Sequence, residues 1–478
     1  MGLAYRIFAV LWTVAVTYDF AVRTMTRDTE PLLVTCAAVL VLLRPSSTIR
    51  LVALSLAQLW FALDQAPGRT MVHWYFNALV HLSIVGAWLH LAVKQRTLAV
   101  DGGALYEAFR GPAMLIALTA LTLAGFSKLN SSYLDPSSSC ATVLWLIQVE
   151  YLPWLPSQGV FRQFPIWGSI VCELLGPGLL AFRRTRPAGI ALLGGFFFFI
   201  GINPVNWLYE FAGPTLLCSL LVVGEPAWTS AWRWLSGSPV GTLVRAAGPF
   251  RKPLVLTLLL ALAWLAVMGD LAEHRLLRRQ LARVSWVVGE PLLVGSLLLA
   301  VLRQPWFERA RLGALLGAGP RWLLAVFALF LASESLPYVG IKHTTTFTMA
   351  GNTRFEDGFR NHLVLPEVPD LYWNRGVQVV NSSNDRYLQK QARRRTVMNF
   401  LTLASHLHRK PDSQATIRLR GEVETIGRAG DDPRFAEPPP LWRWLKYPPS
   451  STTPEVGCSH RRTLDKIRKK KAKRRNAG

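Results

Sequence analysis

The chain has 478 residues, of which 51% are hydrophobic and 17% are charged, and it contains 18 tryptophans. Soluble globular proteins average about 25% charged residues, so the composition argues against an ordinary soluble enzyme and indicates a polytopic membrane protein. The formal net charge is +24. Because no nucleic-acid recognition motif accompanies this charge, it indicates cytoplasmic loops and contact with anionic lipids, with no nucleic acid as partner.

Eleven apolar runs fill the first 336 residues, and each is a candidate membrane helix because a span takes about 20 residues. They lie near 5–20, 31–43, 51–63, 72–93, 112–128, 166–182, 187–202, 206–223, 253–269, 285–302 and 320–336. Since two of them, 31–43 and 51–63, are short for a span, we predict an all-α polytopic membrane bundle of about 9–11 transmembrane helices. The first run lacks a cleavage site and is expected to be a retained helix.

The fourth run carries a polar stripe in the sequence MVHWYFNALVH, where His73, Asn77 and His81 are spaced four residues apart. This spacing places them on one face of a helix. Polar side chains at membrane depth cost about 2.5–3.5 kcal/mol each, so the stripe should face the interior of the bundle. There it either lines a wet cavity or forms structural hydrogen bonds to neighbouring helices.

The fifth run ends in AGFSKLN, and Lys128 therefore lies at the end of a membrane helix. Such a lysine is either an anchor whose ammonium reaches the interface or a general base, because desolvation disfavours the charged form of a buried lysine. The following segment, 129–165, is rich in aromatic residues and is expected to lie along one membrane face, with an interfacial helix over Cys140 to Leu152.

Glu173 lies near the middle of the sixth run. A carboxylate at that depth should be protonated or paired with a cation. It forms either a structural hydrogen bond between helices or part of a functional site.

The five cysteines are far apart in the sequence and form neither a C-x-x-C pair nor a zinc spacing, so no metal site or redox motif is predicted. Cys36, Cys172 and Cys218 lie in apolar runs and are interpreted as small buried hydrophobic residues.

Beyond Leu336 the composition becomes polar, with short alternating runs such as Thr344–Met349 and Thr416–Arg420 that are typical of strands. We predict a small α+β extramembrane domain over 337–428, with one helix from Arg393 to His408. Residues 429–478 are predicted to be a Pro-rich linker followed by a disordered basic tail. The tail carries ten basic residues between Arg461 and Arg475, which favours the cytoplasmic side.

The motif at the end of the fifth run resembles the A-G-x-x-K-L-[DN] motif of the HTTM (horizontally transferred transmembrane), or vitamin K-dependent gamma-carboxylase-like, family. It is matched by Ala124, Gly125, Lys128, Leu129 and Asn130. His73 followed by Trp74 and Tyr75 is similar to a second family feature, and the stretch from Thr346 to His362 resembles a segment of bacterial members. The resemblance covers the helical portion, residues 1–336, and the large lumenal domain of the animal carboxylase has no counterpart here.

The resemblance implies a lipid- or quinol-dependent enzyme of the bacterial cell membrane, with carboxylase-like chemistry. In this interpretation Lys128 is the base that takes a proton from a reduced quinone similar to vitamin K, and His73 assists it. Asn77, His81 and Glu173 are then expected to contact the substrate, with no metal. A non-catalytic membrane scaffold or transporter with the same helical fold is the alternative, and the protein substrate is left open.

Overall fold

The structure is a computed structural model, and it describes residues 2–23, 29–65, 72–203, 209–237, 272–304, 311–317, 319–339, 362–365, 375–394, 396–436, 450–451, 458 and 461–475. The chain forms two compact units. The first comprises residues 1–64, 73–122 and 171–330, and the second comprises residues 65–72, 123–170 and 331–478. Residues 123–170 group with the C-terminal part of the chain, so this division of the sequence differs from the predicted boundary at Leu336.

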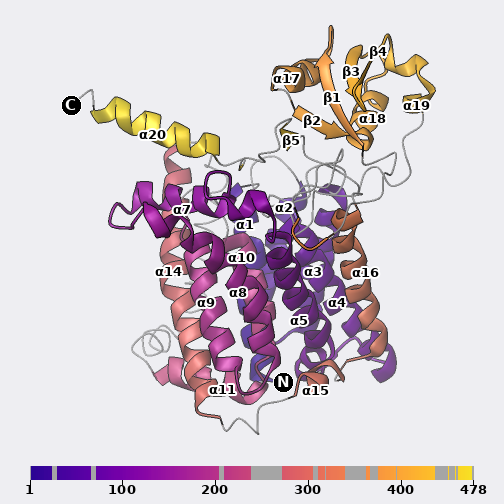
Figure 1. The fold of residues 1–478 in the computed structure, drawn as a ribbon. Coiled ribbons are helices and arrows are strands. Elements are labelled where there is room, and N and C mark those ends of the chain that lie inside the picture. The colour runs from indigo at the N-terminus through magenta and orange to yellow at the C-terminus, as the bar shows by residue number, and fades with distance from the viewer. Residues whose placement is uncertain are drawn as a thin grey trace. The chain divides into compact units, whose positions relative to one another are not determined.

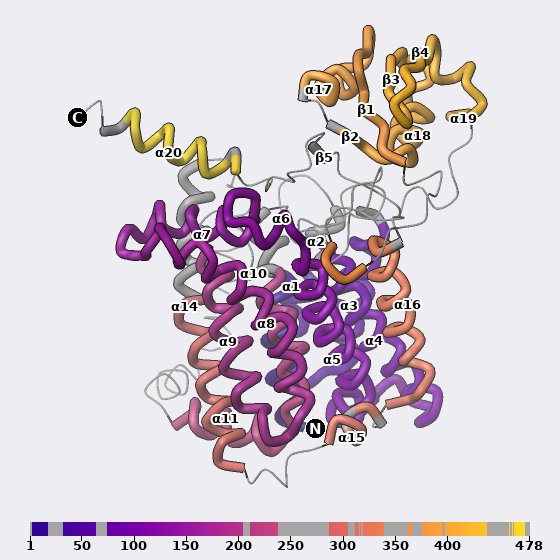
Figure 2. Tube along the Cα trace, in the orientation of Figure 1, coloured from indigo at the N-terminus to yellow at the C-terminus, as the bar shows by residue number. Residues whose placement is uncertain are grey.

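The first unit is a helix bundle, drawn in Figures 1 and 2. Its helices are α1 (Leu3–Arg23), α2 (Thr29–Leu43), α3 (Thr48–Gln65), α4 (Val72–Gln95), α5 (Gly102–Ser127), α8 (Phe164–Ala181), α9 (Arg186–Gly201), α10 (Tyr209–Leu220), α11 (Glu225–Gly237), α14 (Ala272–Leu302), α15 (Leu312–Gly317) and α16 (Leu324–Ser335), some of which end in the second unit. Helix α1 packs against α2, α10 and α11, while α9 packs against α10 and α14.

Glycines let α9 approach α14 closely. A Cβ atom placed on Gly201 would lie 2.2 Å from Nε1 of Trp286, and one placed on Gly194 would lie 2.5 Å from Val294. Both glycines lie on α9 and are seven residues apart, so they share one face of the helix. Small residues on a shared face allow two helix backbones to pack at short distance, which is a common contact between membrane helices.

Three of the described helices are long and apolar enough to cross a membrane, namely Trp74–Gln95 in α4, Gly102–Ser127 in α5 and Phe164–Ala181 in α8. Helices α10 and α11 would add a fourth span if this pair, bent by 120°, forms one broken span. Shorter apolar helices occur at Leu3–Thr17, Leu32–Leu43, Thr48–Leu63, Cys140–Tyr151, Arg186–Gly201 and Trp286–Leu302. The predicted span at 253–269 lies outside the described residues.

The second unit contains a small antiparallel sheet near the C-terminus, with the strand order β4-β3-β1-β2-β5. The strands are β1 (Gly376–Asn381), β2 (Thr396–Asn399), β3 (Ala415–Leu419), β4 (Glu422–Ile426) and β5 (Ser450–Ser451), and the helices near them are α17 (Arg386–Arg394), α18 (Phe400–His408) and α19 (Pro433–Ala436). Arg420 and Gly421 join β3 to β4 with φ angles of 54° and 85°. Positive φ at both turn residues suits the right-handed twist of a two-residue hairpin. Val377, Ile417, Phe400 and Leu403 lie in the core of this fold.

The structure confirms a strand over most of Thr416–Arg420 and corrects the predicted helix from Arg393 to His408. That stretch contains the end of α17, strand β2 and helix α18. Residues 397–399 pair with β1, in the register Gly376↔Asn399. The side chain of Asn399 then accepts a hydrogen bond from the Thr402 N–H and so caps α18. The predicted strand at Thr344–Met349 lies outside the described residues.

The basic tail differs from its prediction, since residues Arg461–Arg475 form helix α20 and not a disordered segment. Helix α20 packs against α7 (Cys140–Tyr151), which follows the short helix α6 (Ser131–Leu134) in the same unit. The helix at 140–151 confirms the helical part of the prediction for Cys140 to Leu152. Tertiary contacts with α7 explain why a sequence of such low hydrophobicity is helical, because they add to the weak helical preference of a short isolated segment.

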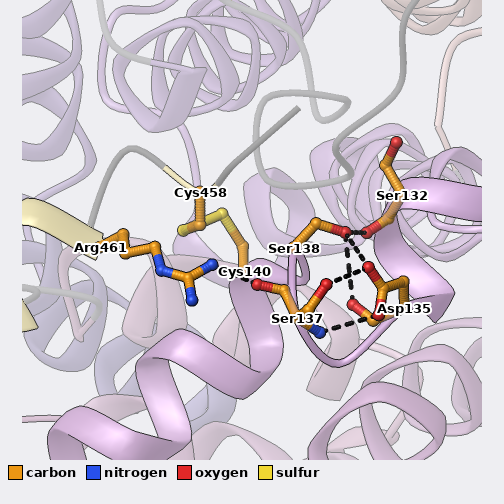
Figure 3. The surroundings of a disulfide bond; sticks show 7 residues. All are labelled: Ser132, Asp135, Ser137, Ser138, Cys140, Cys458 and Arg461. Carbon is orange, nitrogen blue, oxygen red and sulfur yellow. Dashed lines mark hydrogen bonds between the residues drawn. A yellow bond between two sulfur atoms is a disulfide. The ribbon is translucent and has the colours of Figure 1, made fainter. Parts of the chain in front are cut away.

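Two cysteines form a bond that no prediction concerned, and two of the three cysteines that were expected to be buried are not fully buried. Cys140 and Cys458 form a disulfide, drawn in Figure 3, although 318 residues separate them. Cys218 is buried as expected, Cys172 is half-buried and Cys36 is exposed. Cys36 is exposed because it lies on an outward apolar face of α2 that also carries the exposed Leu33 and Leu40.

Candidate functional site

Asn130 joins the end of α5 to the start of α6. Its amide Nδ2 donates to the Ser127 carbonyl at 2.8 Å, and its Oδ1 accepts from the Tyr133 N–H at 2.8 Å. The first bond satisfies a carbonyl left open at the end of α5, and the second satisfies an N–H left open at the start of α6. The asparagine amide supplies both the donor and the acceptor that these two bonds use.

Lys128 lies at this junction, and only 6% of the residue is exposed. Its Nζ is 5.6 Å from the centre of the Tyr133 ring. The Tyr133 hydroxyl is hydrogen-bonded to Ser169 Oγ at 2.7 Å, and the Ser169 hydroxyl in turn is 2.9 Å from the Ile166 carbonyl. The ring against which the lysine packs is therefore held by its place in α6 and by the first two turns of α8.

His362, which was not predicted as a site residue, lies against the last turn of α5. Its Nε2 is 3.0 Å from the Phe126 carbonyl, and its Nδ1 accepts hydrogen bonds from the N–H groups of Val364 and Leu365. Because Nδ1 accepts, the ring proton is on Nε2, which donates to Phe126. Burial lowers the pKa of His362 below its usual value, although the bond to Phe126 raises it, so the imidazole is neutral at pH 7.

An aromatic cluster surrounds the imidazole of His362. The Phe126 ring lies 4.7 Å from it and the Tyr338 ring 6.2 Å from it, between centroids. The Tyr338 hydroxyl donates to the Leu123 carbonyl at 3.2 Å, and the Leu363 N–H donates to the Leu129 carbonyl at 2.9 Å. In the sequence, His362 was part of the stretch that resembles bacterial family members, but no local pattern placed it beside α5.

His81 belongs to a second buried polar group, in the first unit. Its Nδ1 is 2.9 Å from Ser55 Oγ, and Ser55 donates its own proton to the Leu51 carbonyl. His81 therefore donates through Nδ1, which leaves Nε2 as an acceptor. The Trp12 ring meets the imidazole edge-on at 5.3 Å.

This polar group contains atoms that lack a hydrogen-bond partner among the residues that the structure describes. They are His81 Nε2, Asn77 Oδ1 and Trp12 Nε1. Asn77 is 6% exposed and His81 is fully buried, so both face the interior as the stripe predicts. Buried polar atoms of this kind usually bind water or a ligand.

The two other predicted site residues are Glu173 and His73. Glu173 lies on α8 and is 4% exposed. His73 lies on α4, but its side chain is outside the described part of the chain. Since His73 belongs to the first unit and Lys128 to the second, a cavity that both share stays a prediction.

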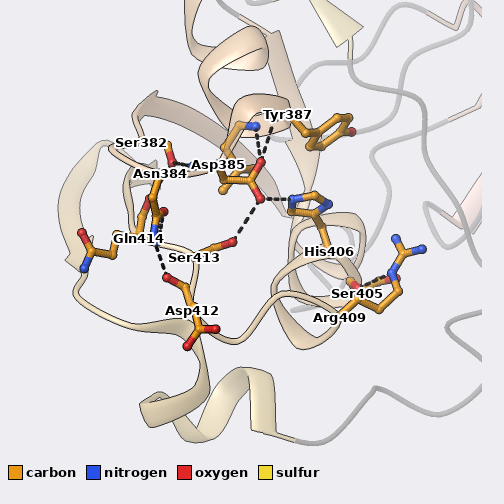
Figure 4. A network of polar contacts seen from close by, with 11 residues as sticks. Ser382, Asn384, Asp385, Tyr387, Ser405, His406, Arg409, Asp412, Ser413 and Gln414 are labelled. Carbon is orange, nitrogen blue, oxygen red and sulfur yellow. Dashed lines mark hydrogen bonds and ion pairs between the residues drawn. The ribbon is translucent and has the colours of Figure 1, made fainter.

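The sheet region holds a further polar network, around Asp385 (Figure 4). Asp385 accepts hydrogen bonds from the N–H groups of Tyr387 and Leu388, from His406 Nε2 at 2.9 Å and from Ser413 Oγ at 3.0 Å. The serine bonds to the carboxylate and not to the imidazole, so the three residues do not form a nucleophile–base pair. The network instead connects the start of α17 to α18 and to the start of β3.

Comparison of the chain with known protein families, with curated proteins and with solved structures found no match. Within the described residues, no three or more His, Cys, Asp or Glu side chains are grouped so that they would hold a metal ion.

Proposed function

We propose that the chain is a multi-pass integral membrane protein, of the bacterial cell membrane. Three apolar helices of sufficient length support this proposal. Large apolar side chains also point outward from several helices, such as Leu63 (61% exposed) on α3, Val93 (77%) on α4 and Leu175 (50%) on α8. In water such a surface would be an aggregation hazard, whereas in a bilayer it contacts lipid tails.

Lys128 acts in this proposal as a general base on a lipid-soluble substrate, and the burial of Lys128 beside Tyr133 carries the proposal. Burial favours the neutral amine, whose lone pair accepts a proton from an acidic hydroxyl of the substrate. Proton transfer gives a substrate oxyanion and a lysine ammonium. The Tyr133 ring then stabilises the ammonium by about 0.5–2 kcal/mol through a cation–π interaction.

A reduced quinone is the substrate class that suits this chemistry. Its phenolic hydroxyl supplies the proton, and its solubility in the bilayer brings it to a site between helices. The aromatic side chains of Phe126, Tyr133 and Tyr338 in this part of the second unit suit contact with a flat ring.

The test measures the rate at which oxygen is consumed when a short-chain naphthohydroquinone is mixed with the purified full-length protein. A base that forms the hydroquinone anion should raise this rate, because oxygen oxidises the anion faster than the neutral hydroquinone. Lys128→Arg should lower the protein-dependent rate by about 100-fold or more, since general-base catalysis contributes at least that much and a guanidinium does not accept a proton. Lys94→Arg is the matched control, because Lys94 is an exposed lysine in the last turn of α4. Full activity in Lys128→Arg would show that Lys128 is not the base.

A non-catalytic scaffold or transporter is the second candidate, and the contact between Lys128 and Tyr133 is the observation that favours it, because a charged lysine gains stability from the same ring. Lipid extraction of the purified protein with mass spectrometry separates the two candidates. A co-purifying quinone or other isoprenoid supports the enzyme. Bulk phospholipid alone, together with no acceleration of hydroquinone oxidation by the wild-type protein, supports the scaffold.

A further inference from the structure

One face of helix α20 is bound to α7. Leu464 is 3% exposed and Ile467 is half-buried. On the same face, Arg468 Nε lies 3.0 Å from Glu150 Oε1 and Lys471 Nζ lies 3.1 Å from Glu150 Oε2. These four residues are spaced as one stripe of a helix, i, i+3, i+4 and i+7. Burial would raise the pKa of Glu150, but its hydrogen bonds to Arg468 and Lys471 lower it below the usual range, so the carboxylate is charged at neutral pH.

The attachment of this helix is also covalent. The disulfide between Cys140 and Cys458 connects the start of α7 to the residues just before α20, and Arg461 donates to the Ser137 carbonyl beside it (Figure 3). Disulfides form and persist in oxidising compartments and are rare in a reduced cytosol. The segment 129–165 and the basic helix therefore belong on the non-cytoplasmic side of a membrane, contrary to the cytoplasmic position that the charge of the tail predicts.

The opposite face of α20 carries lysines that α7 leaves exposed. Lys466, Lys469, Lys470 and Lys473 are all exposed, and their spacing is again i, i+3, i+4 and i+7. Each lysine of this lysine stripe comes two residues after the corresponding residue of the face bound to α7, and two residues correspond to about 200° around a helix. The four ammonium groups therefore point away from α7.

The segment that holds α20 also exposes aromatic side chains. Trp154 is 76% exposed, Phe164 is 58% exposed and Trp167 is 52% exposed. Trp154 follows α7, and Phe164 and Trp167 lie in the first turn of α8, which is a candidate span. Tryptophan favours the headgroup level of a bilayer, so these residues indicate that α7 and the helix bound to it lie at the membrane surface.

We propose that the lysine stripe of α20 binds anionic phospholipid headgroups at the non-cytoplasmic face of the membrane. The proposal rests on the proposed membrane location of the chain. Four like charges on one rigid face repel each other, and a layer of phosphate groups offsets this repulsion. Because α20 is fixed to α7 by the disulfide and by Glu150, the stripe is already oriented and loses little conformational entropy on binding.

Native mass spectrometry of the full-length protein in detergent, with equimolar phosphatidylglycerol and phosphatidylcholine, tests the stripe. The wild-type protein should bind phosphatidylglycerol preferentially. The variant with Lys466→Gln, Lys469→Gln, Lys470→Gln and Lys473→Gln should lose this preference by about tenfold or more, because each lysine near an anionic surface contributes to attraction. The matched control is Arg386→Gln, Lys390→Gln, Lys410→Gln and Arg418→Gln, which removes the same charge from exposed positions in the sheet region. It should change the preference by less than about twofold.

The outcomes separate this proposal from the proposed function. Release of the wild-type protein from membranes by alkaline carbonate would contradict the membrane location itself. Retention in the membrane, with an unchanged phosphatidylglycerol preference in the four-lysine variant, would overturn the stripe alone. A wild-type protein that binds an oligonucleotide or an acidic peptide through these lysines, without a phosphatidylglycerol preference, would also overturn it.

Trypsin added outside sealed spheroplasts tests the side of the membrane. It should remove a C-terminal epitope tag from the wild-type protein by cutting in the lysine stripe. Protection of the tag until the spheroplasts are lysed would place the helix in the cytoplasm and overturn the proposal.

Discussion

At the scale of single residues, the junction after α5 shows why a motif has the composition that it has. The motif AGFSKLN ends with an asparagine because Asn130 satisfies open backbone groups of two successive helices. Lys128 is buried beside Tyr133 at the same junction. Asn130, which in the sequence is part of the motif that resembles a family, therefore also has a structural role.

The first prediction concerns this residue. Asn130→Ala should lower the free energy of unfolding by about 1–3 kcal/mol, because the Ser127 carbonyl and the Tyr133 N–H both lose their partner in a buried place. The shift of the thermal unfolding midpoint in detergent measures this effect. Gln95→Ala, at an exposed position in α4, is the control and should leave the midpoint nearly unchanged. Equal midpoints for Asn130→Ala and the wild type would contradict the capping role.

The second prediction concerns Asp385. Burial would raise its pKa, but hydrogen bonds from the Leu388 N–H and from His406 lower it to about 2, below the usual value of about 3.9. A depressed carboxylate pKa stabilises the folded state above the unfolded pKa, and this contribution is lost as the pH falls from about 4 towards 2. Burial is the main cause that lowers the pKa of His406 below its usual value. Acid therefore protonates this histidine in the unfolded protein before it does so in the folded protein, which lowers the free energy of unfolding.

Hydrogen exchange of the amides in α17 and α18 of the full chain, corrected for the intrinsic effect of pH, measures this loss. Protection in the wild-type protein should begin to fall below about pH 6.5 because of His406, and it should fall further between pH 4 and 2 because of Asp385. Asp385→Asn should show lower protection at neutral pH and a flatter acid limb. Asp412→Asn removes an exposed carboxylate that pairs with Arg428 and should behave as the wild type does. A steep acid limb in Asp385→Asn would assign the pH dependence to another group.

At the scale of elements, two helices pack more closely than most side chains would allow. The contact between α9 and α14 depends on glycines that face α14, of which Gly201 is the tightest. Gly195, only one position from Gly194 on the same helix, has open space at the place of its Cβ atom. Neighbouring glycines of one helix thus have different roles.

The third prediction compares these glycines. Gly201→Ala should lower the free energy of unfolding by about 1–3 kcal/mol, because its methyl group would overlap Trp286 and force a shift of the helices. Gly195→Ala should be neutral or should stabilise the protein by about 0.5–1 kcal/mol, since alanine is the better helix former. Thermal unfolding in detergent measures both variants. A Gly201→Ala protein as stable as Gly195→Ala would exclude the close contact.

The fourth prediction concerns the disulfide that connects two elements. In the denatured, unreduced protein N-ethylmaleimide should modify three cysteines, namely Cys36, Cys172 and Cys218. After reduction it should modify all five. Cys140→Ser should expose four reactive thiols without reduction, because Cys458 loses its partner. Intact-mass spectrometry counts the adducts, and five adducts on the unreduced wild-type protein would show that the disulfide is absent.

At the scale of the whole molecule, local patterns and long-range contacts carried different information. Apolar runs and their periodicity predicted helices through the first 336 residues, because helix formation and burial depend on neighbours three and four residues away. The same reasoning placed Asn77 and His81 on one buried face of α4. It also predicted the strand at Thr416–Arg420, most of which is β3.

The errors lie where residues distant in the sequence meet. The helix predicted from Arg393 to His408 is interrupted because residues 397–399 pair with β1, and no pattern within the stretch itself shows that pairing. His362 meets α5 across 236 residues, and Cys140 meets Cys458 across 318. The sequence by itself determined which segments are apolar helices and which residues share a helix face, since these properties are local. Only the tertiary structure decided that the basic tail is a bound helix and that Lys128 packs on Tyr133, because both depend on how separate segments come together.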